Sequence, residues 1–213
     1  NKTSDYLSLI YHRFLDDKSI KIKINNHSLK PRDPFLEKNK KTTQKKEVSI
    51  SNRDSLNIER QIKVKDFVLP FAADMTAEDM KNAGGAENFR SLQGFYIYRN
   101  KRLIIWGTWF GMRLGELTKN ARIRVDIPNS LDDIWGIDIT KRTATIPKNI
   151  LNQLRKTVKD AMDIATRKQT HRGRKENVDA NISYIWNRMQ GRNNNFYYEL
   201  NKDNLLFKNV KDY

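Results

Sequence analysis

The chain of 213 residues contains no cysteine, which excludes disulfides, thiolate metal sites and cysteine nucleophiles. Its three histidines, His12, His27 and His171, are scattered and do not have the spacing of metal ligands. No apolar run approaches the roughly 20 residues that a membrane helix needs, and no signal peptide is visible. These absences predict a cytoplasmic protein without a metal site or a membrane partner.

The sequence also lacks the motifs of several nucleotide-binding and hydrolytic enzymes. It has no G-x-x-x-x-G-K-[ST], no G-x-G-x-x-G after a predicted strand, no G-x-S-x-G and no H-E-x-x-H. Asp132 and Asp133 could contribute to a metal site, but such a site needs further oxygen ligands, and Asp is also typical of turns. The turn is favoured, and no catalytic residue is predicted in this chain.

Basic residues are abundant instead, with 41 Lys and Arg against 25 Asp and Glu and a net charge of +16. Such an excess favours a polyanionic partner, most often nucleic acid, although a basic solvated surface would give the same count. The densest cluster follows the longest predicted helix. Its candidates for contact with a nucleic-acid backbone are Arg167, Lys168, Arg172, Arg174 and Lys175. The alternative is that these cations complement the negative end of the helix dipole.

Several elements of the first half are predicted from periodicity and turn residues. Residues 5–15 have the apolar spacing of a helix, and residues 20–25 alternate as a strand. Residues 37–47 are polar, basic and non-periodic, which favours a mobile loop or linker over a phosphate-binding loop. Thr76, with an acid three residues later, resembles a helix-capping box, and the short helix is expected to stop at Gly84-Gly85.

Alternation predicts most strands between residues 48 and 147. They include residues 48–50 and 57–70, a hairpin at 94–106 that turns at residues 99–101, and short strands at 121–128, 134–139 and 143–147. In the strand 121–128, Ile123, Val125 and Ile127 face one way, and Arg122, Arg124 and Asp126 face the other.

Aromatic and basic residues interleave between residues 95 and 113. The aromatic residues are Phe95, Tyr96, Tyr98, Trp106, Trp109 and Phe110. Two interpretations remain: a stacking platform for single-stranded nucleic acid, or a sheet with an aromatic inner face and a basic outer face. The second is favoured, because alternation alone predicts it.

The clearest helix begins after a predicted Asn149 cap and ends around residues 167–170. One face carries Ile150, Leu151, Leu154, Val158, Ala161, Met162 and Ala165. Strands grouped before one long helix predict an α+β fold, with a mostly antiparallel sheet and helices on one face. Residues 176–213 are expected to form a small helix and a hairpin, or the start of a further domain.

Several stretches together resemble a known ATPase superfamily. They are "QGFYIYRNKRLI", "ARIRVDIP", "DIWGIDITKRTATIP" and the Lys- and Arg-rich helix. They look like the region after the nucleotide-binding domain of GHKL ATPases, which include DNA gyrase, MutL proteins, MORC proteins and the ninety-kilodalton heat-shock chaperone. "YHRFLDDKSIKIKINNHSLKPRDPF" resembles the end of the ATPase domain itself. The resemblance covers roughly residues 5–170.

The resemblance implies a transducer domain with a left-handed β-α-β fold. It would place the end of a truncated ATPase domain at residues 1–36, a loop or linker at 37–56, the transducer-like domain at 57–175 and an extension at 176–213. In such families a lysine of a transducer loop reaches the γ-phosphate of ATP in the neighbouring domain. Lys141 of "DITKR" has the matching strand–Lys–strand layout, and Arg142 is a second candidate.

The chain departs from the superfamily in one respect. The Asn/Glu helix, the D-x-G-x-G motif and the Gly-rich lid of a GHKL ATPase are not found in these residues. We therefore expect a fragment that holds no cofactor itself, with ATP and Mg²⁺ bound in an N-terminal ATPase domain, DNA or another polyanion as partner, and nucleotide-dependent homodimerisation of the intact protein. The alternative function is a stand-alone basic nucleic-acid-binding module of the same fold.

Overall fold

The computed structural model describes residues 2–112, 118–136, 146–169, 174–175, 184–190, 196–201 and 204. The chain forms two compact units, Asn1–Gln169 and Thr170–Tyr213. Within the described residues the fold is α+β, as predicted, and its sheets are mostly antiparallel. None of the helices described there is long and apolar enough to cross a membrane.

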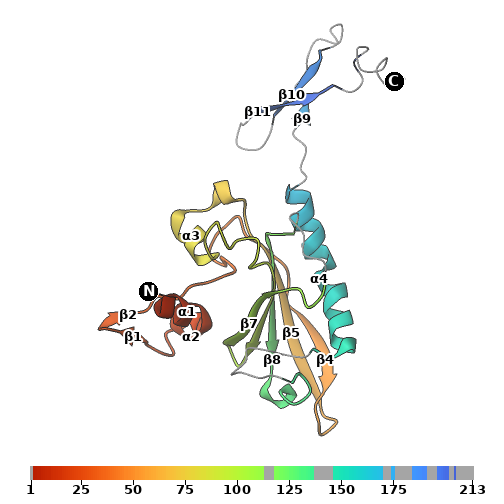
Figure 1. Ribbon diagram of the computed structural model, residues 1–213. Coiled ribbons are helices and arrows are strands. Elements are labelled where there is room, and N and C mark those ends of the chain that lie inside the picture. The colour runs from red at the N-terminus through yellow and green to blue at the C-terminus, as the bar shows by residue number, and fades with distance from the viewer. Residues whose placement is uncertain are drawn as a thin grey trace. The chain divides into compact units, whose positions relative to one another are not determined.

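The first unit is built around a mixed sheet (Figure 1). Its six described strands are β3 (Thr43–Gln44), β4 (Val48–Arg53), β5 (Glu59–Val68), β6 (Gly94–Arg99), β7 (Arg102–Thr108) and β8 (Ala121–Ile127). The order is β3-β5-β8-β6-β7, and β4 also pairs with β5. All pairs are antiparallel except β6 and β8, which run parallel and are connected through β7 and residues 109–120.

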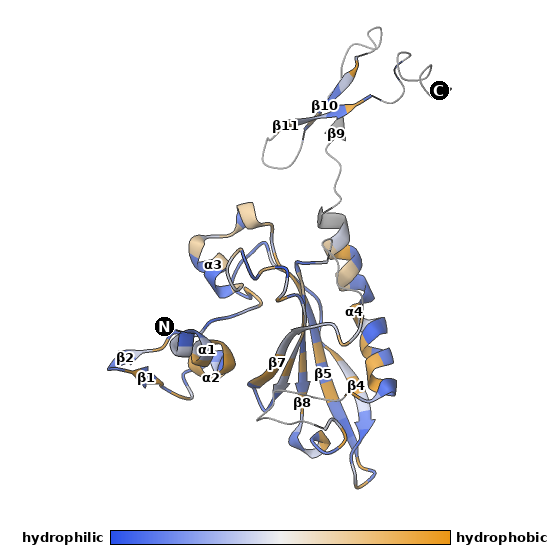
Figure 2. Cartoon of the chain, in the orientation of Figure 1, coloured by the Kyte–Doolittle hydropathy of each residue, from blue (hydrophilic) through white to orange (hydrophobic). Residues whose placement is uncertain are grey.

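Helix α4 (Lys148–Gln169) covers one face of this sheet (Figure 1). Its predicted apolar face is confirmed: Leu154, Val158 and Ala161 are fully buried against residues of β5, β6 and β8. Figure 2 shows the apolar and polar residues alternating along α4, as expected for a helix that packs on one side only. The predicted Asn149 cap is wrong, because α4 begins at Lys148 and Asn149 lies in its first turn.

The opposite face is covered by the N-terminal segment, residues 2–37. Helices α1 (Lys2–Ile10) and α2 (His12–Asp16) are followed by a short two-stranded hairpin at residues 23–28 and then by a stretch that leads to Phe35. Phe35 is fully buried, with its ring 4.6 Å from Phe67 and 5.2 Å from Tyr96, measured between centroids. The sheet therefore has a covered face on both sides, although the sequence predicted only the one under α4.

Three predicted turns and caps are confirmed. Thr76 forms a capping box with Asp79 at the start of α3 (Ala77–Asn82), which ends before the positive-φ residues Gly84 and Gly85. The hairpin β6–β7 turns at Asn100 and Lys101, both with positive φ. Asn25 and Asn26 also have positive φ and form the turn between β1 (Lys23–Ile24) and β2 (His27–Ser28). The strand expected at 20–25 is therefore only two residues long.

Two regions differ from the expected secondary structure. Residues 37–56, which the resemblance made a loop or linker, contain β3 and β4, both paired with β5. The alternation at residues 48–50 had correctly predicted the start of β4. Residues 134–136, expected to begin a strand, form a turn in which Trp135 is fully buried. Residues 137–145, which were expected to complete that strand and most of the next, lie outside the described residues.

The second unit contains a small antiparallel sheet of order β11-β10-β9 in its described part. Its strands are β9 (Arg174–Lys175), β10 (Trp186–Gln190) and β11 (Phe196–Leu200). A hairpin is present, formed by β10 and β11. No helix lies among the described residues of this unit, where a small helix had also been expected.

Candidate functional site: a polar network beside a charged cavity

The site is built on β8, whose side chains alternate as predicted. Ile123, Val125 and Ile127 face α4, while Arg122, Arg124 and Asp126 face the N-terminal segment. Because that segment covers the face, these three charged residues are largely removed from water instead of forming a solvated outer surface. Buried charges require specific partners, and the partners come from residues far away in the sequence.

Arg122 connects β8 to two loops. It is fully buried, and its guanidinium donates hydrogen bonds of 2.6 Å to the backbone carbonyls of Pro34 and Ala83. The same group lies 5.6 Å from the ring centroids of Phe89 and Tyr96, within cation–π range. Burial lowers the pKa of Arg122 from its ordinary value. Arg122 thus fixes the extended segment before Phe35 and the end of α3 to the centre of the sheet.

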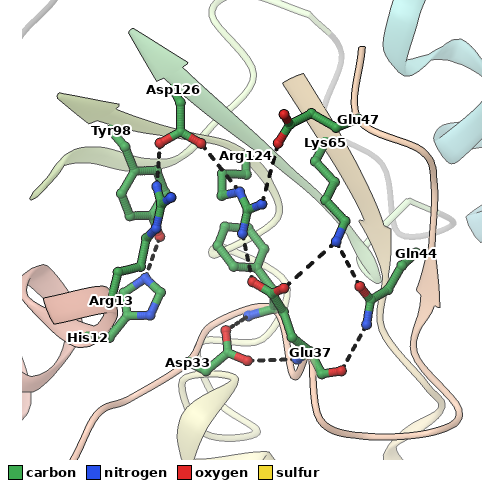
Figure 3. Close-up of polar contacts among 11 residues, drawn as sticks. His12, Arg13, Asp33, Glu37, Gln44, Glu47, Lys65, Tyr98, Arg124 and Asp126 are labelled. Carbon is green, nitrogen blue, oxygen red and sulfur yellow. Dashed lines mark hydrogen bonds and ion pairs between the residues drawn. The ribbon is translucent and has the colours of Figure 1, made fainter. Parts of the chain in front are cut away.

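Arg124 and Asp126 continue this chain of contacts (Figure 3). Asp126 forms an ion pair with Arg13 of α2 and lies 3.5 Å from the Nε of Arg124. Arg124 donates a 2.7 Å hydrogen bond to Glu37 and lies 3.8 Å from Glu47. The network therefore joins α2, the residues after Phe35 and the residue before β4 to a single strand.

The backbone around Glu37 is held by its own polar contacts. The Asp33 carboxylate accepts hydrogen bonds from the backbone N–H groups of Phe35 (2.8 Å) and Glu37 (2.7 Å). Burial nevertheless raises the pKa of Asp33 above its ordinary value. On the other side, Lys65 lies 3.8 Å from Glu37 and donates to Gln44 at 2.9 Å. The segment predicted to be solvated is thus attached to β5 and β8 at its first residue.

His12 is the titratable group at the edge of the network. Its Nε2 lies 2.7 Å from the Tyr98 hydroxyl. Burial lowers the pKa of His12 to about 3, and the nearby charges of Arg13 and Arg124 act in the same direction. Burial also raises the pKa of Tyr98 well above its ordinary value. Both shifts favour the neutral forms, and the two side chains form a buried hydrogen bond between α2 and β6.

A cavity of about 570 Å³ opens beside the network, between α2, residues 30–39 and α3. Six carboxylates line it: Asp16, Asp17, Asp33, Glu37, Glu78 and Asp79. Its four Lys and Arg residues include Lys38 and Lys101, which bind Asp16 at 2.6 Å and Asp17 at 2.8 Å. The volume suits a small molecule, but most small-molecule sites are apolar and this wall is charged and largely paired. Across the described part of the chain, no group of three or more His, Asp or Glu side chains could hold a metal ion.

The residues predicted to contact phosphate are described only in part. Lys141, Arg142 and Arg172 lie outside the described residues. Arg167 and Lys168 lie in the last turn of α4, while Arg174 and Lys175 form β9. The basic cluster predicted from the sequence is thus divided between the two compact units.

The stacking platform, the less favoured of the two interpretations of residues 95–113, is contradicted by the burial of its rings. Phe95, Trp109 and Phe110 pack on the α4 side of the sheet. Tyr96, Tyr98 and Trp106 pack on the side of the N-terminal segment. Rings that are buried or half-buried on two opposite faces cannot stack together on one strand of nucleic acid. The favoured alternative is also only half right, because aromatic and basic side chains share the second face.

Sequence reasoning missed the network itself. Arg13 and Glu37 carried no signal, since each lies in a stretch of ordinary polar composition. The one available signal was the alternation that places Arg124 and Asp126 on the same face of a predicted strand, and alternation does not identify the partners of that face.

Comparisons with protein families, with curated proteins and with solved structures find no match for this chain.

Proposed function

We propose that this chain is the transducer-like part of a GHKL-type ATPase and couples ATP binding and hydrolysis in an N-terminal domain to movement of a partner-binding region. The observation that carries the proposal is the network that joins Arg13 and Glu37 to β8. It attaches the segment that resembles the end of an ATPase domain to the central strand of the sheet. Because close-packed and hydrogen-bonded contacts transmit displacement, movement of that segment would be passed to the sheet.

The transducer-type fold belongs to the same proposal. A mixed sheet with one parallel pair, β6 and β8, and a long helix on one face supports it. Among the described residues, this parallel pair is connected through β7. The described strands contain no parallel pair joined by a helix, so the left-handed β-α-β unit stays a proposal.

In this proposal Lys141 reaches the γ-phosphate of ATP held by the N-terminal domain, with Arg142 as the second candidate. A lysine there would make charge-assisted hydrogen bonds to that phosphate. The loop carrying Lys141 would be released when hydrolysis removes the phosphate, which is an order-to-disorder switch. This chain alone is expected neither to bind ATP tightly nor to hydrolyse it. A cytoplasmic location and nucleotide-dependent dimerisation are part of the same proposal.

The test uses the longer protein that contains the ATPase domain. Lys141→Ala should lower the ATPase rate on the order of a hundredfold, as loss of one charge-stabilising donor does, and should weaken nucleotide-dependent dimerisation. Lys141→Arg, which keeps the charge, is the matched control and should lose less. If Lys141→Ala leaves both the rate and the dimerisation unchanged, Lys141 has no part in the mechanism.

The net charge of +16 supports a second function, a stand-alone nucleic-acid-binding module. Gel-shift binding of the chain across a series of salt concentrations tests it. Contacts to phosphates predict a steep loss of affinity with salt, and replacing Lys168 or Arg172 by Gln should reduce the logarithmic slope by about one each. Absence of binding would leave a protein-interaction scaffold.

A further inference from the structure

The second unit has one sheet face on which all the described side chains are exposed. Along β10 they are Trp186, Arg188 and Gln190, and their cross-strand partners on β11 are Leu200, Tyr198 and Phe196. The residues between them belong to the other face and are half-buried or buried. We call the exposed side the aromatic face.

This exposure is unusual for large rings. Trp186 is 57% exposed, Tyr198 64% and Phe196 40%. In the first unit, by contrast, the rings of the main sheet are buried on one face or the other. Clusters of exposed aromatic surface mark sites of interaction. Arg188 adds a charge to the same face, because its guanidinium lies 4.0 Å from the centroid of Phe196.

We propose that the aromatic face binds single-stranded nucleic acid, with bases stacked on Trp186 and Tyr198 and phosphates paired with Arg188. Exposed flat rings accept bases of any sequence, and a basic surround holds the backbone. Sheet faces with exposed aromatic residues bind unpaired bases in this way. This inference does not depend on the ATPase; it deepens the second function proposed above by naming the site and the single-stranded form of its ligand.

Charge complementarity favours this occupant. Residues 170–213 contain eight Lys and Arg against five Asp and Glu, a net charge of +3 in a chain of +16. The described strands of this sheet carry one acid, Glu199, and its position belongs to the other face. The backbone register also pairs Arg174 with Gln190, which brings one of the predicted nucleic-acid residues into the same sheet.

A protein occupant fits less well. An apolar partner would remove the guanidinium of Arg188 from water, and desolvating a charge is costly. A second copy of the chain would bring another Arg188 and the same positive charge, and like charges at an interface are unfavourable. A duplex is also disfavoured, since its base faces are already stacked on one another.

The test measures binding of the full chain to a fluorescein-labelled strand of about 20 thymidines, longer than the roughly 4–16 nucleotides that one such platform covers. Fluorescence anisotropy gives the affinity. Trp186→Ala should weaken binding about 5- to 150-fold, the equivalent of ~1–3 kcal/mol for one stacked base. Trp186→Phe should retain most of the affinity. Arg188→Gln should lose more than Arg53→Gln, which removes the same charge from the first unit.

Controls make each outcome decisive. Leu56→Ala removes an apolar side chain that is 76% exposed in the first unit and should bind like the wild type. Circular dichroism checks the fold, and Tyr198→Ala provides a second variant if Trp186→Ala does not fold. The proposal is overturned if these face variants bind like the wild type, or if a duplex of equal length binds as tightly as the single strand. It is also overturned if sedimentation shows a dimer, without oligonucleotide, that Trp186→Ala dissociates.

Discussion

The two faces of the main sheet are covered by different kinds of contact. Under α4 the contact is mainly apolar, and Leu154 and Val158 are fully buried against strand residues such as Val125. Under the N-terminal segment the contact combines aromatic rings with ion pairs centred on Arg124 and Asp126 (Figure 3). Apolar packing depends mostly on volume, whereas a buried polar network needs every partner in place.

This difference predicts a division of roles. Burying one Leu or Val side chain stabilises a fold by about 1.5–3 kcal/mol, while a buried ion pair contributes little net stability because desolvation offsets the attraction. We therefore expect the α4 face to supply most of the stability of the first unit. The opposite face should instead determine where the N-terminal segment lies, which is what the proposed coupling requires.

The largest expected effect is on the α4 face. Leu154 is fully buried between α4 and the sheet, so Leu154→Ala should lower the free energy of unfolding by about 3–5 kcal/mol, through lost burial and the cavity left behind. Urea denaturation measures this change. Lys156→Ala on the exposed side of α4 is the control and should stay within about 0.5 kcal/mol of the wild type. Similar losses from both variants would mean that α4 does not depend on its apolar face.

The next largest effect comes from Asp66, a carboxyl group among the apolar residues of the same face. Asp66 alternates with Val64 and Val68, is 5% exposed and has one carboxylate oxygen without a hydrogen-bond partner among the described residues. Burial raises the pKa of Asp66 to about 7 from 3.8, with Lys45 opposing the shift and Asp160 adding to it. The folded state therefore holds a proton between about pH 4 and 7 that the unfolded state releases, so this group makes stability fall as the pH rises through that range.

Asp66→Asn should remove this dependence. The free energy of unfolding of the variant, minus that of the wild type, should rise by about 2–4 kcal/mol from pH 4 to pH 8. Each pKa unit corresponds to about 1.4 kcal/mol. Urea denaturation at a series of pH values measures the difference between the two proteins. A constant difference over that range would show that Asp66 titrates normally in the folded state.

The two faces also differ in how well the sequence predicts them. Most of the apolar face of α4 was predicted, because a period of 3.6 is a local property; of the predicted residues only Leu151 is absent from the core. The hairpin at Asn100, the capping box at Thr76 and the alternation of β8 were predicted for the same reason. Each depends on residues that are close in sequence.

The polar face was not predicted, because its partners are distant. Arg13 and Asp126 are separated by 113 positions, and Arg124 and Glu37 by 87. Periodicity indicates that Arg124 shares a face with Asp126, but it does not indicate whether solvent or another segment covers that face. The same limit explains the error at residues 95–110, where a strong aromatic pattern was divided between two covered faces.

The smallest expected effect concerns two ion pairs made by α2, one half-buried and one exposed. The side chains of Arg13 and Asp126 are 23% and 21% exposed, whereas those of Lys38 and Asp16 are 83% and 48% exposed. A double-mutant cycle with Arg13→Met and Asp126→Asn should give a coupling energy of about 0.5–2 kcal/mol. The matched cycle with Lys38→Met and Asp16→Asn should give less than about 0.5 kcal/mol, because water screens exposed pairs.

This comparison also decides what holds the N-terminal segment. A larger coupling for Arg13 and Asp126 would mean that the network, and with it the orientation of α2 on β8, depends on paired charges. Equal couplings near zero would leave the aromatic contacts of Phe35 with Phe67 and Tyr96 as the attachment. In that case the aromatic contacts position the N-terminal segment without the ion pair. Asp126→Asn in the longer protein should then leave nucleotide-dependent dimerisation unchanged.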